Sequence, residues 1–188
     1  DDWALMIAQL SAVVVTQGKG VLICVPDGRD VRRVGAALQG CLGEGQHVEL
    51  TAEAGPSARY RDFLALVRGS VKVVVGTRAA AFAPVRDLGL IVLWDDGDPL
   101  HAEPRAPYPH AREVLLLRAE QQRPGIVLGG FARSQEAQHL VTTQWAHELV
   151  VPRSALRRRA LIEVVPAADR SVATRIPQRA YEAIRAGL

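Results

Sequence analysis

Three carboxylates follow an apolar run in the middle of the chain, and carboxylates in such a position can hold a divalent cation. Asp95, Asp96 and Asp98 come directly after the apolar residues 90–93. Oxygen ligands of this kind suit Mg²⁺. The acidic loop is therefore the first candidate for catalysis, with Asp95 and Asp96 as the candidate residues.

A second loop carries residues that suit a phosphate group. The apolar run 73–75 opens onto Gly76, Thr77 and Arg78. Glycine permits close approach of the backbone, threonine supplies a hydroxyl, and arginine supplies positive charge. The alternative is an ordinary turn at the end of a strand, whose arginine meets a carboxylate.

The elements that must position these loops alternate between strand and helix. Apolar runs predict strands, and apolar residues at a period near 3.6 predict helices. Pro26–Arg29 is a turn after the first strand, and Asp30 is the expected cap of the helix that follows. Strands are expected at 21–25, 47–50, 71–75, 90–93, 125–128, 148–151 and 160–165, and helices at 2–15, 30–39, 57–67, 110–121, 134–141 and from Pro177 onward.

This alternation predicts an α/β fold: a mostly parallel sheet with helices on both faces. Ligands of such folds bind in the loops at the carboxyl ends of the strands. The two loops above both lie there, as do Pro26–Arg29 and 129–133. The expected organisation is a lobe over residues 1–150 and a tail over 151–188.

The composition fits a globular domain and narrows its class only a little. The chain has 188 residues, of which 48% are hydrophobic, and its formal net charge is +3. That charge permits nucleic-acid binding without demanding it. No apolar run is long enough to span a bilayer, and a signal-peptide pattern is missing at the N-terminus, so we expect a cytoplasmic location. Cys24 and Cys41 lack the spacing of a zinc site, and no metal site is expected.

The four strand-end loops, in this order, resemble the first motor lobe of superfamily 2 helicases. More narrowly, the chain resembles the primosomal protein N′ (PriA) family of replication-restart helicases in its actinobacterial form. The resemblance covers roughly residues 3–150. It is carried by Val25-Pro26-Asp27, the run 73–93 and Tyr108-Pro109-His110-Ala111-Arg112-Glu113.

The resemblance implies a RecA-like P-loop NTPase fold, DNA as a partner and a role in the primosome. It also implies DNA contacts at Gly76, Thr77 and Arg78, and in the basic and aromatic loop of Arg105, Tyr108 and Arg112. Arg29 could face DNA or lie in a plain turn. Arg112 could instead pair with Glu113 or Asp98. The family's zinc motifs and second motor lobe would lie elsewhere in a full-length protein.

The chain departs from the family pattern where nucleotide would be bound and hydrolysed. No G-x-x-x-x-G-K-[ST] phosphate loop occurs in the chain. The acidic motif Asp-Glu-x-His is replaced by Trp94-Asp95-Asp96-Gly97, so an indole stands where the Mg-holding carboxylate belongs. The hydroxyl-rich motif after the next strand is replaced by Gly130-Phe131-Ala132.

We therefore expect a replication restart protein that binds branched DNA at stalled forks and other primosome proteins, with little or no helicase activity and doubtful use of ATP and Mg²⁺. The alternative is an active ATP-dependent 3′–5′ DNA helicase, whose phosphate loop lies before Asp1. Two further alternatives are a doubly wound enzyme with a small-molecule pocket and a plain protein-interaction module.

Overall fold

A computed structural model describes residues 3–51, 55–105, 107–150 and 176–187 of the chain. It divides the chain into two compact units, Asp1–Ala146 and His147–Leu188. The described residues of the second unit include helix α7, Gln178–Gly187. The candidate loops all lie in the first unit.

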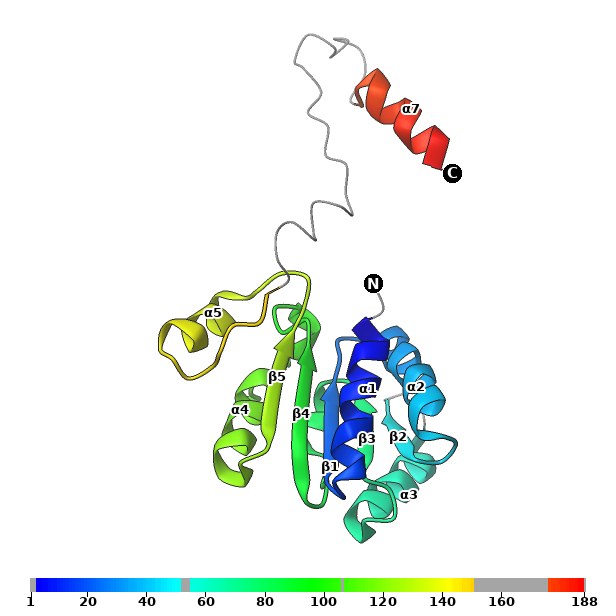
Figure 1. The fold of residues 1–188 in the computed structure, drawn as a ribbon, viewed down its shortest axis with the longest axis vertical. Coiled ribbons are helices and arrows are strands. Elements are labelled where there is room, and N and C mark those ends of the chain that lie inside the picture. The colour runs from blue at the N-terminus through cyan, green and yellow to red at the C-terminus, as the bar shows by residue number, and fades with distance from the viewer. Residues whose placement is uncertain (1–2, 52–54, 106, 151–175, 188) are drawn as a thin grey trace. The chain divides into compact units, whose positions relative to one another are not determined.

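The first unit is built on a five-stranded, all-parallel sheet in the order β2-β3-β1-β4-β5 (Figure 1). The strands are β1 Gly20–Cys24, β2 His47–Leu50, β3 Val73–Gly76, β4 Leu88–Trp94 and β5 Gly125–Gly129. The residues of β1, β3 and β4 are almost all buried, as their uninterrupted apolar runs predict for strands covered on both faces.

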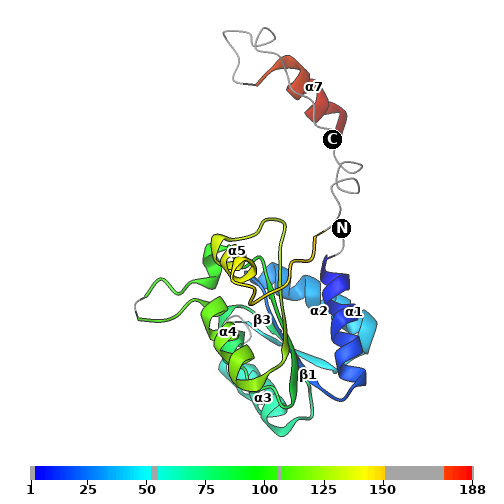
Figure 2. The same ribbon diagram turned by 60° about the vertical axis from the view of Figure 1, so that its left-hand side comes forward.

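Helices cover both faces of the sheet, as the alternating pattern predicts (Figures 1 and 2). On one face, α1 (Trp3–Thr16) and α2 (Gly28–Leu42) pack over a core that includes Ile7, Val34 and Val92. On the other face, α3 (Gly55–Arg68), the short 3₁₀ helix η2 (Arg78–Phe82) and α4 (Ala111–Gln122) pack over a second core. A second 3₁₀ helix, η3 (Pro99–His101), and α5 (Gln135–Thr142) complete the unit.

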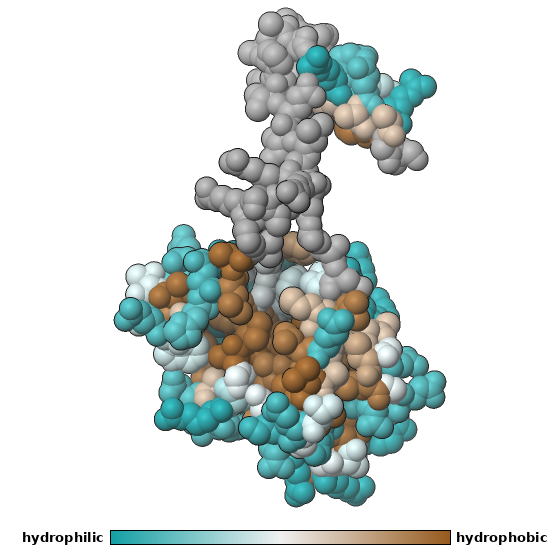
Figure 3. All heavy atoms as spheres, in the orientation of Figure 1, coloured by the Kyte–Doolittle hydropathy of each residue, from teal (hydrophilic) through white to brown (hydrophobic). Residues whose placement is uncertain are grey.

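Part of the first face keeps an apolar surface. Figure 3 shows apolar side chains gathered over β4 and β5. On α1, Met6, Leu10 and Val13 are exposed. Among the described residues, no helix combines the length and the apolar character that crossing a membrane requires.

Three expected elements differ in detail. Helix α2 begins at Gly28, because Asp27 rather than Asp30 caps it: the Asp27 carboxylate accepts from the amides of Arg29 and Asp30 at 2.7 and 2.9 Å. Helix α3 begins at Gly55, two residues before the expected start. The strand expected at 148–151 is wrong over residues 148–150, which have no regular structure, and the strand expected at 160–165 lies outside the described residues.

Candidate nucleotide and nucleic-acid sites at the carboxyl edge of the sheet

An aromatic stack lies at the position where the family resemblance predicts a Mg-holding carboxylate. Trp94, the last residue of β4, stacks on Trp3 of α1 with ring centroids 4.4 Å apart and an interplanar angle of 6°. Both indoles are 7% exposed. Phe131 meets Trp94 edge-on at 5.6 Å, and the Arg33 guanidinium lies 5.1 Å above the Trp3 ring. These groups offer no oxygen ligand, so the stack itself cannot coordinate Mg²⁺.

The three aspartates that follow the stack have different surroundings. Asp98 caps η3 by accepting from the Leu100 amide at 2.8 Å. Asp95 has φ +54°, and its amide donates to the Gly129 carbonyl at 2.6 Å. That left-handed conformation is unfavourable for a residue with a side chain and fixes a sharp turn directly after β4. Within the described residues, no three acidic, histidine or cysteine side chains are grouped so as to hold a metal ion.

Asp96 is buried and held by two neighbours. Its carboxylate lies 3.1 Å from Nη1 of Arg112 and accepts a short hydrogen bond from the Ser134 hydroxyl. Arg112 also donates to the Asp96 carbonyl at 3.1 Å. Because Asp96 is buried and its Oδ2 is held by both neighbours, it is poorly placed for a cation that arrives from solvent.

Arg112 is the centre of this buried ion-pair cluster. Only 5% of the residue is exposed. Besides Asp96, its guanidinium pairs with Glu136 of α5 at 3.2 Å and with Glu113 at 3.3 Å. The cluster joins the loop after β4, the start of α4 and the start of α5. The sequence suggests Glu113 or Asp98 as the ion-pair partner of Arg112. The structure shows the pair with Glu113, and it shows a pair with Asp96 instead of Asp98.

Two histidines next to this cluster have structural partners. His110 caps α4, since its Nδ1 accepts from the Arg112 amide at 3.1 Å. His101 is fully buried, and its Nε2 lies 2.9 Å from the Trp94 carbonyl, which only a protonated nitrogen can satisfy. Its Nδ1 then faces the Cys24 thiol at 4.0 Å. Burial raises the pKa of Cys24 to about 12.

The carboxylates around the aromatic stack interact with one another electrostatically. The pKa of Asp30 is raised, first by burial and then by the neighbouring charges of Asp27, Asp95 and Asp98, with Arg33 acting in the opposite direction. Carboxylates that raise the pKa of a neighbour in this way show that negative charge gathers beside the aromatic stack.

The Gly76-Thr77-Arg78 loop links β3 to η2. A side chain at Gly76 would meet the Leu50 carbonyl at 2.6 Å and the Ala80 Cβ at 2.7 Å, so close packing of the backbone requires glycine there. Arg78 forms an ion pair with Glu103 at 2.7 Å and donates to the Leu100 carbonyl at 3.4 Å. Arg78 therefore pairs with a carboxylate, as in the alternative of an ordinary turn, but 39% of its side chain remains exposed to solvent.

The remaining predicted nucleic-acid residues are on the surface. Arg29 is exposed at the start of α2, and Arg105 and Tyr108 are exposed in the loop before α4. Of the predicted set, Gly76 at the end of β3 and Arg112 are buried.

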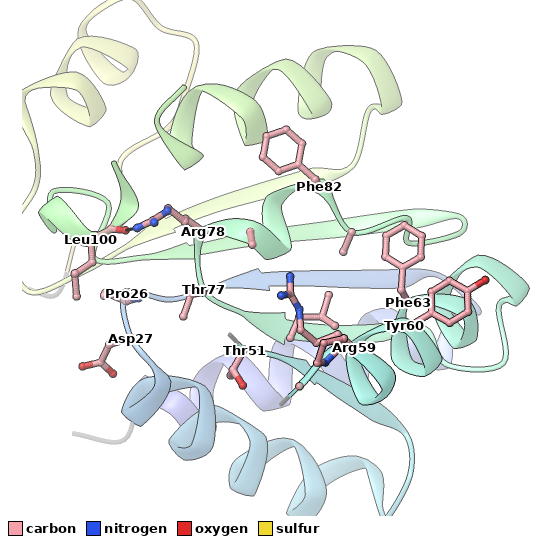
Figure 4. A pocket seen from close by; sticks show the side chains of 15 residues that line it. Pro26, Asp27, Thr51, Arg59, Tyr60, Phe63, Thr77, Arg78, Phe82 and Leu100 are labelled. Carbon is pink, nitrogen blue, oxygen red and sulfur yellow. Dashed lines mark hydrogen bonds between the residues drawn. The ribbon is translucent and has the colours of Figure 1, made fainter. Parts of the chain in front are cut away.

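A cavity of about 760 Å³ lies beside Thr77 and Arg78, at the carboxyl ends of β1, β2 and β3 (Figure 4). Its walls also include Arg59, Tyr60 and Phe63 of α3 and Phe82 of η2, none of which the sequence assigned to a site. Tyr60 and Phe63 show the spacing of a buried helix face, but Leu66 is the buried residue of α3. Periodicity defines a face without saying whether it points inward.

Comparison with known proteins yields relatives but no matching family model. The chain is 49% identical over 158 residues to the probable replication restart protein PriA of Mycobacterium tuberculosis (strain CDC 1551 / Oshkosh) and 46% identical over 160 residues to that of Mycobacterium leprae (strain TN). These matches cover 84% and 85% of the chain and 24% and 25% of the relatives. The replication restart protein PriA of Bacillus subtilis (strain 168) is 26% identical over 151 residues, which cover 80% of this chain and 18% of that relative. The chain thus spans about a quarter of the mycobacterial proteins.

Among solved structures, the DUF1998 helicase MrfA bound to DNA has a similar fold. It aligns with a TM-score of 0.50 at 10% identity, over 75% of this chain and 18% of that one. This similarity concerns the fold alone and agrees with the RecA-like architecture that the sequence predicts.

Proposed function

Since the chain is homologous to one segment of the replication restart protein PriA, we propose that it is the first motor lobe of a replication restart protein that binds DNA at stalled forks and does not hydrolyse ATP. In this proposal, the full-length protein acts with other primosome proteins as a platform. One observation supports the loss of hydrolysis above all: the Trp3–Trp94 stack occupies the position of the cation ligand.

Three further features support the same proposal. The Asp96 carboxylate is bound to Arg112 and Ser134. Asp95 stands where the family has a glutamate that polarises water, one methylene short of it, and a misplacement of about 1 Å can cost on the order of 100-fold in rate. Phe131 packs on Trp94, so the loop after β5 contributes an aromatic ring in place of coupling hydroxyls.

For DNA, we propose contacts at Thr77, Arg78, Arg29, Arg105 and Tyr108. All five belong to loops or helix starts that follow strands of the same sheet edge, where such folds bind ligands. We leave Arg112 out of the interface, because a buried guanidinium with three carboxylate partners is not available to a phosphate.

ATP hydrolysis by the full-length protein tests the main claim. We expect no DNA-stimulated turnover on forked DNA, under conditions in which an active helicase assayed in parallel turns over. The variant Trp94→Asp should stay inactive too, because Gly97, Gly130 and Ala132 remain and because it loses the buried stack on Trp3, so turnover by the wild-type protein decides the claim. Rapid hydrolysis by the wild-type protein would favour the alternative, an active 3′–5′ helicase.

DNA affinity measured over a range of salt concentrations tests the second claim. Arg78→Ala should weaken binding and reduce the slope of log K against log salt by roughly 1, because one phosphate contact is lost. Unchanged affinity and slope would remove Arg78 from the interface.

A further inference from the structure

Three exposed aromatic side chains line the cavity beside Arg78. Tyr60 and Phe63 lie on α3 and are 66% and 43% exposed, and Phe82 at the end of η2 is 64% exposed. Figure 4 shows them on both sides of the space between α3 and η2. Phe63 and Phe82 are two of the three phenylalanines of the whole chain. Such a concentration of exposed aromatic surface marks a binding site.

The protein holds Phe82 outward. Ala81 and Ala83, on either side of it, are buried at 0% and 2% exposure. Arg118 of α4 donates from Nη1 to the carbonyls of both residues, at 2.7 and 2.9 Å. Because the backbone on both sides of Phe82 is fixed, its ring cannot turn into the core. The aromatic wall is therefore a built feature and not a loose surface side chain.

The same cavity also presents groups that suit phosphates. Arg59 is exposed on the α3 wall, and Arg78 lies at the end of the cavity away from the aromatic rings, where Thr77 also lines it. A purely apolar peptide carries no negative charge to pair with two guanidinium groups. Duplex DNA would meet the arginines but keeps its bases inside the helix, where they cannot stack on side chains. A single strand offers both phosphates and free base faces.

Resting on the DNA-binding role proposed above, we propose that this cavity holds single-stranded nucleic acid. Bases stack on Tyr60, Phe63 and Phe82, and the backbone phosphates lie at Arg59 and Arg78. Stacking of this kind tolerates any base, because every base has a flat π-face. The cavity thus binds an unpaired strand without sequence specificity.

Binding of labelled oligonucleotides by the full-length protein tests the inference. The probes are an oligothymidylate and an oligomer of equal length and charge that carries abasic sites. Removing one stacked ring should weaken binding of the intact oligomer by about 5- to 150-fold. We expect this loss for Phe82→Ala and for Tyr60→Ala, with no change in salt slope and little further loss on the abasic oligomer.

Two matched variants define the baseline. Leu117→Ala removes an apolar side chain that is 58% exposed on α4, outside the cavity walls, and should leave binding unchanged. Arg59→Ala should weaken binding of intact and abasic oligomers alike and reduce the salt slope by roughly 1. The aromatic variants thus report on bases, and the arginine variant on phosphates.

A second measurement locates the strand directly. An oligomer carrying 5-iodouracil, which cross-links to aromatic side chains in stacking contact, should label the peptides of α3 or η2. Cross-links confined to other segments would overturn the inference.

The outcomes separate this inference from the proposal on which it rests. If the protein binds single strands and neither aromatic variant changes the affinity, the stacking cavity is refuted while DNA binding stands. The same holds if the aromatic variants weaken intact and abasic oligomers equally, because the rings then do not act through bases. If no DNA of any form binds, both proposals fail.

Discussion

Truncating Arg112 should destabilise the protein strongly and leave its intrinsic DNA affinity unchanged. The Arg112 and Asp96 side chains are only 6% and 5% exposed, and their charged atoms lie 3.1 Å apart. Arg112→Ala leaves the Asp96 carboxylate buried without its cation. Only the Ser134 hydroxyl remains to satisfy it.

The size of the effect follows from the burial. Breaking a buried ion pair by removing one partner costs about 3–5 kcal/mol. The remaining Ser134 hydrogen bond places the expected loss near the lower end, about 3 kcal/mol. For a unit the size of Asp1–Ala146, each kcal/mol shifts the melting temperature by about 3 °C, so we expect a decrease of about 10 °C.

Chemical and thermal denaturation of the full-length protein measure this loss, and Arg61→Ala is the matched control. Arg61 also pairs with a neighbouring carboxylate, Asp62 at 3.7 Å, but its side chain is 78% exposed. A surface pair of this kind contributes about 0–1 kcal/mol. DNA affinity, corrected for the folded fraction, should be the same for both variants and the wild type.

A double variant sharpens the test. Asp96→Asn removes the buried negative charge, so Arg112→Ala combined with it should cost clearly less than the sum of the two single changes. If Arg112→Ala costs no more than Arg61→Ala, or if the two changes simply add, the buried cluster does not stabilise the fold in the way we describe. If Arg112→Ala lowers DNA affinity without loss of stability, Arg112 belongs to the interface after all.

Two further predictions concern Glu103 and His110. Glu103→Gln frees Arg78 from its 2.7 Å ion pair and should tighten binding of single-stranded DNA about two- to fivefold, the worth of a partly exposed pair; titration of a labelled oligomer measures this, and weaker binding would contradict it. The pKa of His110 is lowered by burial first and then by Arg112 and His101, against the opposing charges of Glu113 and Glu136. The unfolded state therefore binds a proton first as the pH falls, so stability is intact above about pH 6.5 and declines below it. His110→Asn, which keeps an acceptor at the helix cap, should lose less stability between pH 7.5 and 5.5 than the wild type in denaturant titrations, and identical losses would refute the assignment.

The sheet could be predicted because its signals are local. Runs such as 21–25 and 90–93 are apolar at every position, and only a strand covered on both faces uses such a run in a short segment. The sequence alone also shows an indole at position 94, but the loss of cation binding stays a prediction. The start of α2 was misplaced because Asp27 and Asp30 are both good helix caps, and the choice between them depends on the turn after β1.

The partners of the site residues could not be predicted, because they are separated widely in sequence. Arg78 meets Glu103, and Arg112 meets Asp96 and Glu136, only once the strands and helices are in place. The aromatic cavity was missed for a related reason. Tyr60 and Phe63 recur at helical spacing, and only the position of α3 on the sheet shows that they face solvent.

The indole at position 94 also holds the fold together. Replacing it with aspartate would remove the packing partner of Trp3 and Phe131 and set a carboxylate among apolar rings. Excising a buried aromatic of that size costs about 3–5 kcal/mol, out of a total stability of about 5–15 kcal/mol for a typical domain. An aspartate at position 94 would therefore remove a large part of the stability of the fold before it could serve as a cation ligand.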